Sequence, residues 1–303
     1  MRALFHKFER YLLTEKMVAD NTVAAYRRDI MQLINFLQSE YKLSTFEEVK
    51  LDHLKSFLAF LRKNLEVGAR SASRKLSAFK SFARYLETYR DIPNFTEGIV
   101  FPKIGKKLPS YLSEEDIQKL FTVASLDQTL AGYRNKTMLC LLYVCGFRVS
   151  ELTGLKISNI DFQERIIHIT GKGGKSRVIP LQSSIIELLR YYLQHIHHQI
   201  VNPAREAATD ILFPIVFKKS VHPVSRQAFW ITLKKLARAA EIQTSISPHT
   251  LRHSLATHLL KEGANLRLLQ MLLGHEQLDT VQIYTHVEMS QLRDMYEKHH
   301  SRA

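Results

Sequence analysis

Apolar residues in the first 100 positions recur every three or four residues, which is the spacing of amphipathic helices. Polar or glycine-containing segments separate four such stretches. Their apolar positions are Phe5, Phe8 and Leu12; Val23, Tyr26, Ile30, Leu33 and Leu37; Leu54, Phe57, Leu58 and Leu61; and Leu76, Phe79, Phe82, Ala83 and Leu86. Asn21 is a plausible cap for the second stretch. The pattern predicts a domain of four helices over residues 1–100.

The pattern breaks at residues 101–112, FPKIGKKLPSYL. Two prolines and Gly105 disfavour a regular element there. Three cations, Lys103, Lys106 and Lys107, occur without an acidic neighbour. The segment is therefore predicted to be a basic linker, and it is suited either to crossing a DNA backbone or simply to lying in solvent.

A second domain is predicted over residues 113–303. Ser113 is a good N-cap, and acidic residues fill the turn that follows it, where they favour the start of a helix. Residues 136–144 are apolar on almost every side, which indicates a buried helix that ends at Gly146. Further helices are predicted from about Ser184 and from about Ser225.

Two β-branched runs flank a Gly-Lys-Gly-Gly turn in this second domain. They are residues 165–170, RIIHIT, and residues 175–180, KSRVIP, and together they predict a β-hairpin with Lys172 and Lys175 at its tip. The run GKS within it does not make a phosphate-binding loop, because Ile169 stands where that motif needs glycine. The predicted fold class is thus mainly α, with a helical first domain and a mixed α+β second domain that contains a small antiparallel sheet.

The stretch SPHTLRHSLATHLL, residues 247–260, has the features of a helix that begins at a phosphate site. Ser247 is a good N-cap, and Pro248 suits the first helical position. His249 falls in the first turn beside Arg252, where free backbone N–H groups favour an anion. A capped core helix with a solvated arginine is the alternative. A zinc site at His249 and His253 is less favoured, because no cysteine lies near and the motif lacks its glutamate. Downstream, Asn265 is expected to cap a short helix that Gly274 ends.

The net charge of the chain indicates a polyanionic partner. The chain has 303 residues, 45% of them hydrophobic, and a formal net charge of +14. Such a balance suits nucleic acid or an anionic membrane. The membrane is disfavoured because the longest apolar run, residues 138–147, is too short to span a bilayer. No signal peptide is recognisable, and Cys140 and Cys145 lie within that apolar run, so a reducing cytoplasmic location is expected.

The fourth predicted helix carries cations on its remaining faces, with small serines between them. The candidates for DNA contact there are Arg70, Arg74, Lys75, Lys80 and Arg84. Small residues beside long cations allow a helix to approach a DNA backbone closely. A solvated basic face is the alternative interpretation.

Several residues with suitable chemistry occur in a fixed order through the second domain. Arg148 and Glu151 lie in CGFRVSEL, and Lys172 lies at the predicted hairpin tip. His249-x-x-Arg252 follows, then His275 in LLGH and Tyr284 in QIYTHV. This ordered set resembles the tyrosine recombinase (phage integrase) family, and its spacing and length most resemble the bacterial Xer recombinases. The resemblance covers nearly the whole chain.

The residue types suit transfer of a phosphodiester to a tyrosine. A tyrosine hydroxyl with a pKa of about 10 is a poor nucleophile, and the phosphodiester repels negative charge. Arg148 and Arg252 offer two planar forks to the non-bridging oxygens, and Glu151 is placed to orient Arg148 unless the pair is a structural salt bridge. His249 and His275 can donate to the same oxygens or manage a proton. No carboxylate cluster for Mg²⁺ is evident.

The resemblance supplies the remaining expectations. It implies that the first domain is SAM-like and binds core DNA, that Tyr284 forms a 3′-phosphotyrosyl link, and that Lys172 protonates the leaving 5′ oxygen. The chemistry itself predicts no metal and no ATP, because the covalent link would store the energy of the broken bond. The resemblance also implies four subunits that exchange strands between two duplex sites, a second related recombinase, a dif-type site and a septal DNA translocase as activator. The amphipathic stretch with Leu292, Met295 and Tyr296 suits docking on a neighbouring subunit.

The sequence leaves other functions open. A recombinase that resolves chromosome or plasmid dimers is favoured, and an integrase or transposon recombinase of the same family would use the same residues. A type IB topoisomerase would share the chemistry without pairing two sites. A DNA-binding protein without catalysis would explain the charge but not the ordered set of candidate residues.

Overall fold

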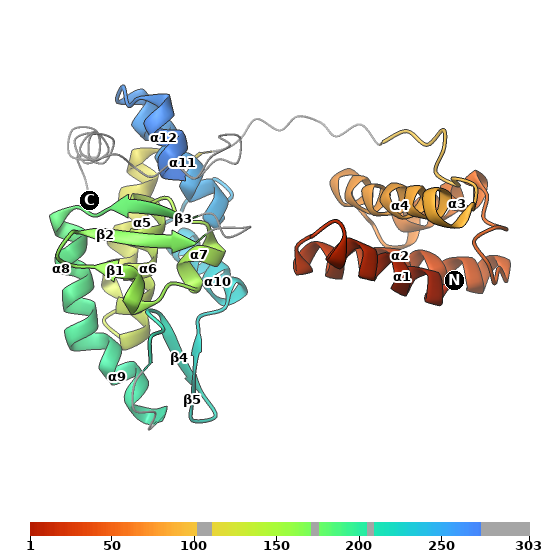
Figure 1. Ribbon diagram of the computed structural model, residues 1–303. Helices are drawn as coiled ribbons and strands as arrows, with labels where there is room; N and C mark the ends of the chain where they lie inside the picture. The colour runs from red at the N-terminus through yellow and green to blue at the C-terminus, as the bar shows by residue number, and fades with distance from the viewer. Residues whose placement is uncertain (102–110, 171–175, 205–208, 274–303) are drawn as a thin grey trace. The chain divides into compact units, whose positions relative to one another are not determined.

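The computed structural model describes residues 1–101, 111–170, 176–204 and 209–273, except for the side chains of Arg70 and Leu268. The chain divides into two compact units, Met1–Lys107 and Leu108–Ala303, shown in Figure 1. Each unit has a hydrophobic core of its own. The candidate residues of the second domain therefore belong to a unit whose hydrophobic core is separate from that of the first.

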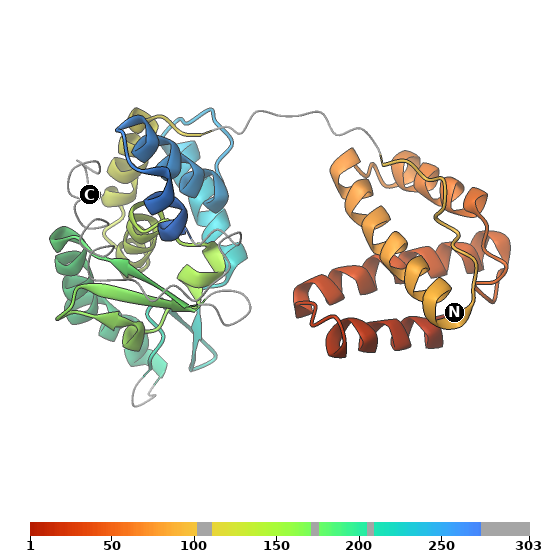
Figure 2. The ribbon, with the colours of Figure 1, turned by 45° about the horizontal axis from the view of Figure 1, so that its top comes forward.

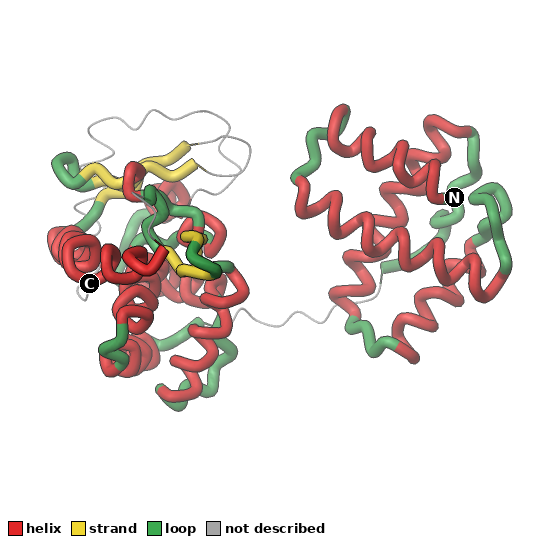
Figure 3. Tube along the Cα trace, turned by 90° about the horizontal axis from the view of Figure 1, so that it is seen from below, coloured by secondary structure: helices red, strands yellow, loops and turns green. Residues whose placement is uncertain are grey.

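The first unit contains the four predicted helices. They are α1 (Arg2–Thr14), α2 (Asp20–Tyr41), α3 (Leu51–Asn64) and α4 (Ala69–Arg90). The helix α2 contacts each of the other three, and Figure 3 shows only helices and loops in the described part of this unit. Aromatic rings fill the centre, where Phe82 packs against Phe5, Phe8 and Phe46. The apolar positions that predicted these helices thus form the hydrophobic core of the unit.

The start of α2 differs from the sequence prediction. The helix begins at Asp20, and the residue in the N-cap position is Ala19, which makes no side-chain hydrogen bond. Asn21 is therefore inside the first turn and is not the cap. The negative charge of Asp20 in the first turn supplies part of the compensation that a cap would give.

Most of the longer helices described in the second unit contact α6. In chain order the described helices, apart from two three-residue turns, are α5 (Glu114–Leu126), α6 (Leu130–Val144), α7 (Val149–Thr153), α8 (Ser183–Tyr191), η3 (Tyr192–His197), α9 (His198–Val201), α10 (Arg226–Ala239), α11 (Pro248–Lys261) and α12 (Leu266–Leu273). The helix α6 contacts α5, α7, α8, α9, α11 and η3, which explains why it is apolar on almost every side. The predicted N-caps are confirmed at Ser113, whose hydroxyl accepts from the N–H of Asp116, and at Ser247, whose hydroxyl accepts from the N–H of Thr250.

The described residues of this unit also form two small antiparallel sheets, which confirms the predicted fold class. The first has the order β1-β2-β3, from Ile160–Asp161, Ile166–Thr170 and Ser176–Pro180. The strands β2 and β3 are the predicted hairpin. The second sheet pairs β4 (Pro214–Phe217) with β5 (Ser220–Pro223), and the sequence did not predict it.

The helix α12 lies against both α11 and β3 (Figure 2). Its N-terminus has the predicted cap, because the side-chain oxygen of Asn265 accepts from the N–H of Arg267. This placement brings the end of α12 to the hairpin and to the α6–α7 turn, which are separated from it by about a hundred residues of sequence. The candidate site lies where these segments meet.

Candidate phosphate site

The turn between α6 and α7 supplies the first two candidate residues. Arg148 occupies the N-cap position of α7, and Glu151 is the third residue of that helix. The carboxylate of Glu151 accepts from the backbone N–H of Arg148 at 2.8 Å and from its Nη1 at 2.9 Å. The predicted contact between the two side chains is thus present. The side chain of Arg148 is 41% exposed, whereas that of Glu151 is 5% exposed, so the guanidinium is the accessible member.

A second arginine holds the same carboxylate from the hairpin. Arg177 on β3 donates from Nη1 to Oε1 of Glu151 at 2.9 Å and from Nη2 to Oε2 at 2.8 Å. Burial alone raises the pKa of Glu151, but the hydrogen bonds and charge of Arg177, followed by the bonds from Arg148, bring that pKa down to about 2. Glu151 is therefore ionised at neutral pH.

Arg252 approaches from α11 and is buried. Its Nη1 donates to the carbonyl oxygen of Gly146 at 2.5 Å, and its Nη2 donates to the carbonyl oxygen of Leu273. Burial lowers the pKa of Arg252 to about 10, and the positive charges of Arg148 and Arg177 act in the same direction. The guanidinium remains charged at neutral pH. Its environment already contains excess positive charge, which an anion would relieve.

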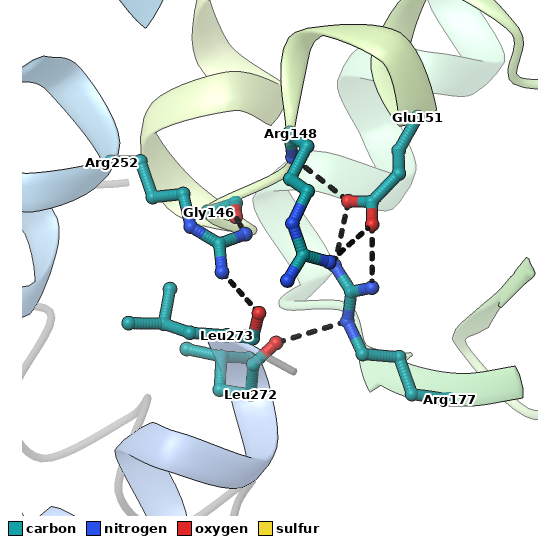
Figure 4. A network of polar contacts seen from close by, with 7 residues as sticks. All are labelled: Gly146, Arg148, Glu151, Arg177, Arg252, Leu272 and Leu273. Carbon is teal, nitrogen blue, oxygen red and sulfur yellow. Dashed lines mark hydrogen bonds and ion pairs between the residues drawn. The ribbon is translucent and has the colours of Figure 1, made fainter. Parts of the chain in front are cut away.

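Figure 4 shows these groups converging at the end of α12. The guanidinium groups of Arg148 and Arg177 bind the carboxylate of Glu151, and the guanidinium of Arg252 is near enough to feel all three charges. The side chains of this cluster therefore carry two more positive than negative charges. A cluster with that excess can bind a phosphodiester and can stabilise further negative charge that develops on its oxygens.

His249 lies in the first turn of α11, one turn before Arg252, and it is exposed. Ser247 caps this helix through the N–H of Thr250 at 3.0 Å. The local structure is the one predicted from the sequence, a capped N-terminus with an accessible histidine. This position suits donation to an anion at the helix start.

The other candidates of the second domain lie outside the described residues. They are Lys172, Lys175, His275 and Tyr284. The structure does describe the residues on either side of the hairpin tip and the helix that ends at Leu273, shortly before His275 in the sequence. Thr170 pairs with Ser176 across the hairpin, and Leu272 and Leu273 accept hydrogen bonds from Arg177 and Arg252.

Two of the candidate cations on α4 share one partner within the first unit. Arg74 and Lys75 both bind the buried carboxylate of Asp29, Arg74 from Nη2 at 3.0 Å and Lys75 from Nζ at 2.8 Å. The side chain of Lys75 is 12% exposed and that of Arg74 is 49% exposed. Lys75 thus has a structural role in this state, while Arg74 keeps an accessible face.

The remaining candidates for DNA contact differ in accessibility. Lys80 donates to the carbonyl oxygen of Ile99 at 3.1 Å and lies 4.6 Å from the ring centroid of Phe101. Arg84 is exposed. The side chain of Arg70, and Lys103, Lys106 and Lys107 of the predicted linker, lie outside the part of the chain that the structure describes.

The described residues contain no group of three or more histidines, cysteines or carboxylates that could hold a metal ion. Within the same residues, no helix is both long enough and apolar enough to cross a membrane. The positive cluster at the end of α12 has the charge and the donors that suit an anion.

Comparison with known proteins identifies the two units separately. Residues 5–88 match the model of the phage integrase N-terminal SAM-like domain, and residues 110–291 match the model of the phage integrase family. The chain belongs to the phage integrase family. It is a tyrosine recombinase, an enzyme that cleaves and rejoins DNA, and its first unit has the SAM-like fold that the resemblance implied.

Sequence similarity to known recombinases covers the whole chain. The chain is 40% identical to tyrosine recombinase XerD of Pseudomonas aeruginosa over 99% of this chain and 97% of that protein. It is 36% identical to tyrosine recombinase XerD of Staphylococcus saprophyticus over the full length of both. The similarity is therefore to recombinases of the Xer type along the entire chain.

Solved structures agree in fold. The Tn1549 transposon integrase in complex with a circular intermediate DNA matches with a TM-score of 0.69 at 18% identity, covering 97% of this chain and 98% of that one. The XerH recombinase bound to its difH substrate matches with a TM-score of 0.65 at 22% identity, covering 90% and 78%.

One member of the positive cluster was missed in the sequence. Arg177 lies on the same side of β3 as the buried Ile179, and an arginine on the buried side of a strand is a signal of pairing. The signal is weak in this recombinase because Val178, on the other side of the strand, is apolar as well. The sequence therefore does not reveal which side faces the core.

We expect Gly146→Ala to destabilise the second unit of the recombinase. Gly146 has φ +60°, and a Cβ atom there would lie 2.8 Å from Cδ2 of Leu273 and 2.9 Å from Cδ2 of Leu255. The left-handed backbone alone costs an L-residue roughly 1–2 kcal/mol. Urea unfolding of the full chain measures the loss. Gly68→Ala is the control, since Gly68 has φ −66° and open space around it. Equal stability of the two variants would contradict this account of the turn.

Proposed function

We propose that this chain is a site-specific recombinase that acts at a dif-like site and resolves dimers of a chromosome or plasmid. The observation that carries the proposal is the cluster of three arginines and one carboxylate at the end of α12. The excess positive charge of this cluster suits a phosphate, and the end of α12 precedes the chain segment that holds His275 and Tyr284. The names of the XerD relatives, at 36% and 40% identity, support the choice of an Xer-type reaction.

In the proposed mechanism, Arg148 and Arg252 bind the non-bridging oxygens of the scissile phosphate. Attack by the hydroxyl oxygen of Tyr284 adds negative charge to those oxygens in the transition state, and preorganised guanidinium groups stabilise that charge without reorganisation. The tyrosine oxygen displaces the 5′ oxygen of the DNA and forms a 3′-phosphotyrosyl link.

The two histidines and the lysine among the candidate residues transfer protons in this mechanism. The hydroxyl of Tyr284 must lose a proton, and His249 or His275 can receive it or donate to the phosphate oxygens. Lys172 gives a proton to the leaving 5′ oxygen. The covalent link stores the energy of the broken bond, so rejoining needs no ATP.

The assembly is part of the proposal. Four subunits exchange strands between two duplex sites, with a second related recombinase supplying half of them and a septal DNA translocase activating the reaction. The cations of the first unit and of residues 101–112 contact the DNA backbone. The reaction takes place in the cytoplasm, where both cysteines stay reduced.

Recombination between two sites on one plasmid tests this function against the alternatives. DNA trapped covalently on the protein is first sequenced to find the target, and two copies are then placed on a supercoiled plasmid. A recombinase yields two circles or an inverted segment. Relaxed plasmid without such products would indicate a type IB topoisomerase, and bound plasmid without any covalent adduct would indicate a protein that only binds DNA. Target sequences that mark the ends of a mobile element would favour an integrase or transposon recombinase.

We expect cleavage to be unaffected by a chelator. The proposed site neutralises the phosphate with guanidinium groups, and a two-metal mechanism would need carboxylates to hold the ions. Formation of the protein–DNA adduct in EDTA is compared with adduct formation in Mg²⁺. An activity that EDTA abolishes and Mg²⁺ restores would contradict the mechanism.

A further inference from the structure

Arg177 occupies an unusual place for a cation. In the β2–β3 register it pairs with Ile169, it shares the inward side of β3 with Ile179, and it is 8% exposed. Burying an ion costs several kcal/mol unless it is paired and hydrogen-bonded. The side chain meets that condition with three donors, since both terminal nitrogens reach Glu151 and Nε reaches the carbonyl oxygen of Leu272 at 3.1 Å.

The shared carboxylate connects Arg177 to the phosphate-binding Arg148. Oε1 of Glu151 accepts from Nη1 of both arginines, each at 2.9 Å. With Arg177 present, the charge of Glu151 is matched by a buried partner. Without Arg177, the same buried carboxylate would have Arg148 as its main counter-ion. It would then neutralise that guanidinium and draw it away from the substrate.

The Nε donor adds a second connection. The last carbonyl groups of a helix lack partners within the helix and carry its negative dipole end. At the end of α12 two successive carbonyls are bound by buried arginines, Leu272 by Arg177 and Leu273 by Arg252. Arg177 therefore ties three segments together: the hairpin that carries Lys172, the helix α7, and the end of α12 that leads to His275 (Figure 4).

We propose that Arg177 is a positioning residue for DNA cleavage, which holds Glu151 against Arg148 while leaving Arg148 its net charge for the scissile phosphate, and which fixes the end of α12 at the same point. This inference rests on the proposed role of Arg148 and Arg252 in binding that phosphate. The buried ion pair of Arg177 and Glu151 would keep the more exposed Arg148 both oriented and charged.

The test compares Arg177→Met with the double variant Arg177→Met/Glu151→Gln. The single variant leaves the carboxylate of Glu151 buried with Arg148, so the cluster loses one positive charge. Misplacement of a binding group by about 1 Å can cost 10²-fold in rate. We therefore expect single-turnover cleavage of a half-site DNA to slow roughly 10- to 100-fold, with half-site binding within about 2-fold of wild type. In the double variant both buried charges are gone and Arg148 regains its net charge, so we expect cleavage to recover at least about 10-fold over the single variant.

A purely structural role would give a different pattern. Removing a second buried partner from a packing network makes the loss deeper, so a double variant that cleaves no faster than Arg177→Met overturns the proposal. Cleavage by Arg177→Met at the wild-type rate also overturns it. If the single variant fails to fold, the double variant still tests the proposal, because the double variant contains no unpaired buried charge. In that case, cleavage by the double variant within about 10-fold of wild type supports the proposal. Slower cleavage by a folded double variant counts against it.

Two further variants separate this inference from the function on which it rests. Arg190→Met removes an exposed arginine of α8 whose guanidinium lies 5.9 Å from the ring of Phe162, and it should cleave as wild type does. Arg148→Ala should lose cleavage. If Arg148→Ala cleaves normally, the phosphate assignment fails, whereas normal cleavage by Arg177→Met alone overturns only the role of Arg177.

Discussion

Tyr284→Phe is expected to lose all covalent attachment to DNA while it binds a half-site as wild type does. The substitution removes one oxygen atom and keeps the aromatic ring, so packing around the position changes little. No phosphotyrosyl bond can form without that oxygen. Denaturing gel electrophoresis of the protein with end-labelled DNA measures the adduct, and a native gel shift measures binding.

Tyr191→Phe is a suitable control for this experiment. Tyr191 lies at the end of α8 and is 47% exposed, and nothing in the proposed mechanism uses its hydroxyl. It should form the adduct at the wild-type level. An adduct that persists undiminished in Tyr284→Phe would show that another residue attacks the phosphate, and mapping the modified peptide would identify it.

Lys172→Ala is expected to slow cleavage by roughly 10²–10⁴-fold, the usual contribution of a positioned general acid. An alkoxide is a very poor leaving group, so expulsion of the 5′ oxygen requires a proton in the transition state. The rate is measured in a single turnover with DNA that carries the ordinary 5′ oxygen at the scissile bond.

Replacement of that bridging oxygen by sulfur makes the test specific. A thiol has a pKa of about 8–9, so thiolate leaves without a proton. We expect Lys172→Ala to cleave the sulfur substrate almost as fast as wild type. Arg148→Ala should gain much less, because its proposed partners are the non-bridging oxygens, which the substitution does not change. Equal rescue of both variants would exclude Lys172 as the specific acid, and Lys175 on the same hairpin would be tested next.

Local signals account for most of the elements that were predicted correctly. The four helices of the first unit follow from the spacing of their apolar residues, and Ser113 and Ser247 cap helices where the sequence placed them. The β2–β3 hairpin follows from two β-branched runs around a glycine-rich turn. These signals are sufficient because a cap, a turn and an amphipathic face each depend on residues that are close in sequence.

The β4–β5 hairpin shows where local signals fail. Its turn residues are Lys218 and Lys219, which have φ values of 50° and 66°. Two positive φ values are usual for a tight hairpin turn, but the sequences that announce such a turn are Asn-Gly or Asp-Gly. Lysine carries no such preference. The strands are also bounded by Pro214 and Pro223, which lowers their apparent strand character.

For this recombinase, the sequence alone determined which residue types could do the chemistry and in what order they occur. It pointed to His249 and Arg252 because imidazole and guanidinium groups beside a capped helix start suit a phosphate, and to Arg148 because of its place in the ordered set. It also determined the contact between Arg148 and Glu151, since three residues in one helical turn bring two side chains together.

Only the tertiary structure decided which cations are engaged inside the protein. Arg177 and Glu151 are 26 residues apart, and Lys75 and Asp29 are 46 apart, yet each pair is in direct contact. Such contacts depend on how β3, α7 and α12, or α2 and α4, pack against one another. Burial then decides whether such a side chain is paired. A charged side chain on the surface is solvated by water, but a buried one needs an opposite charge because water is excluded.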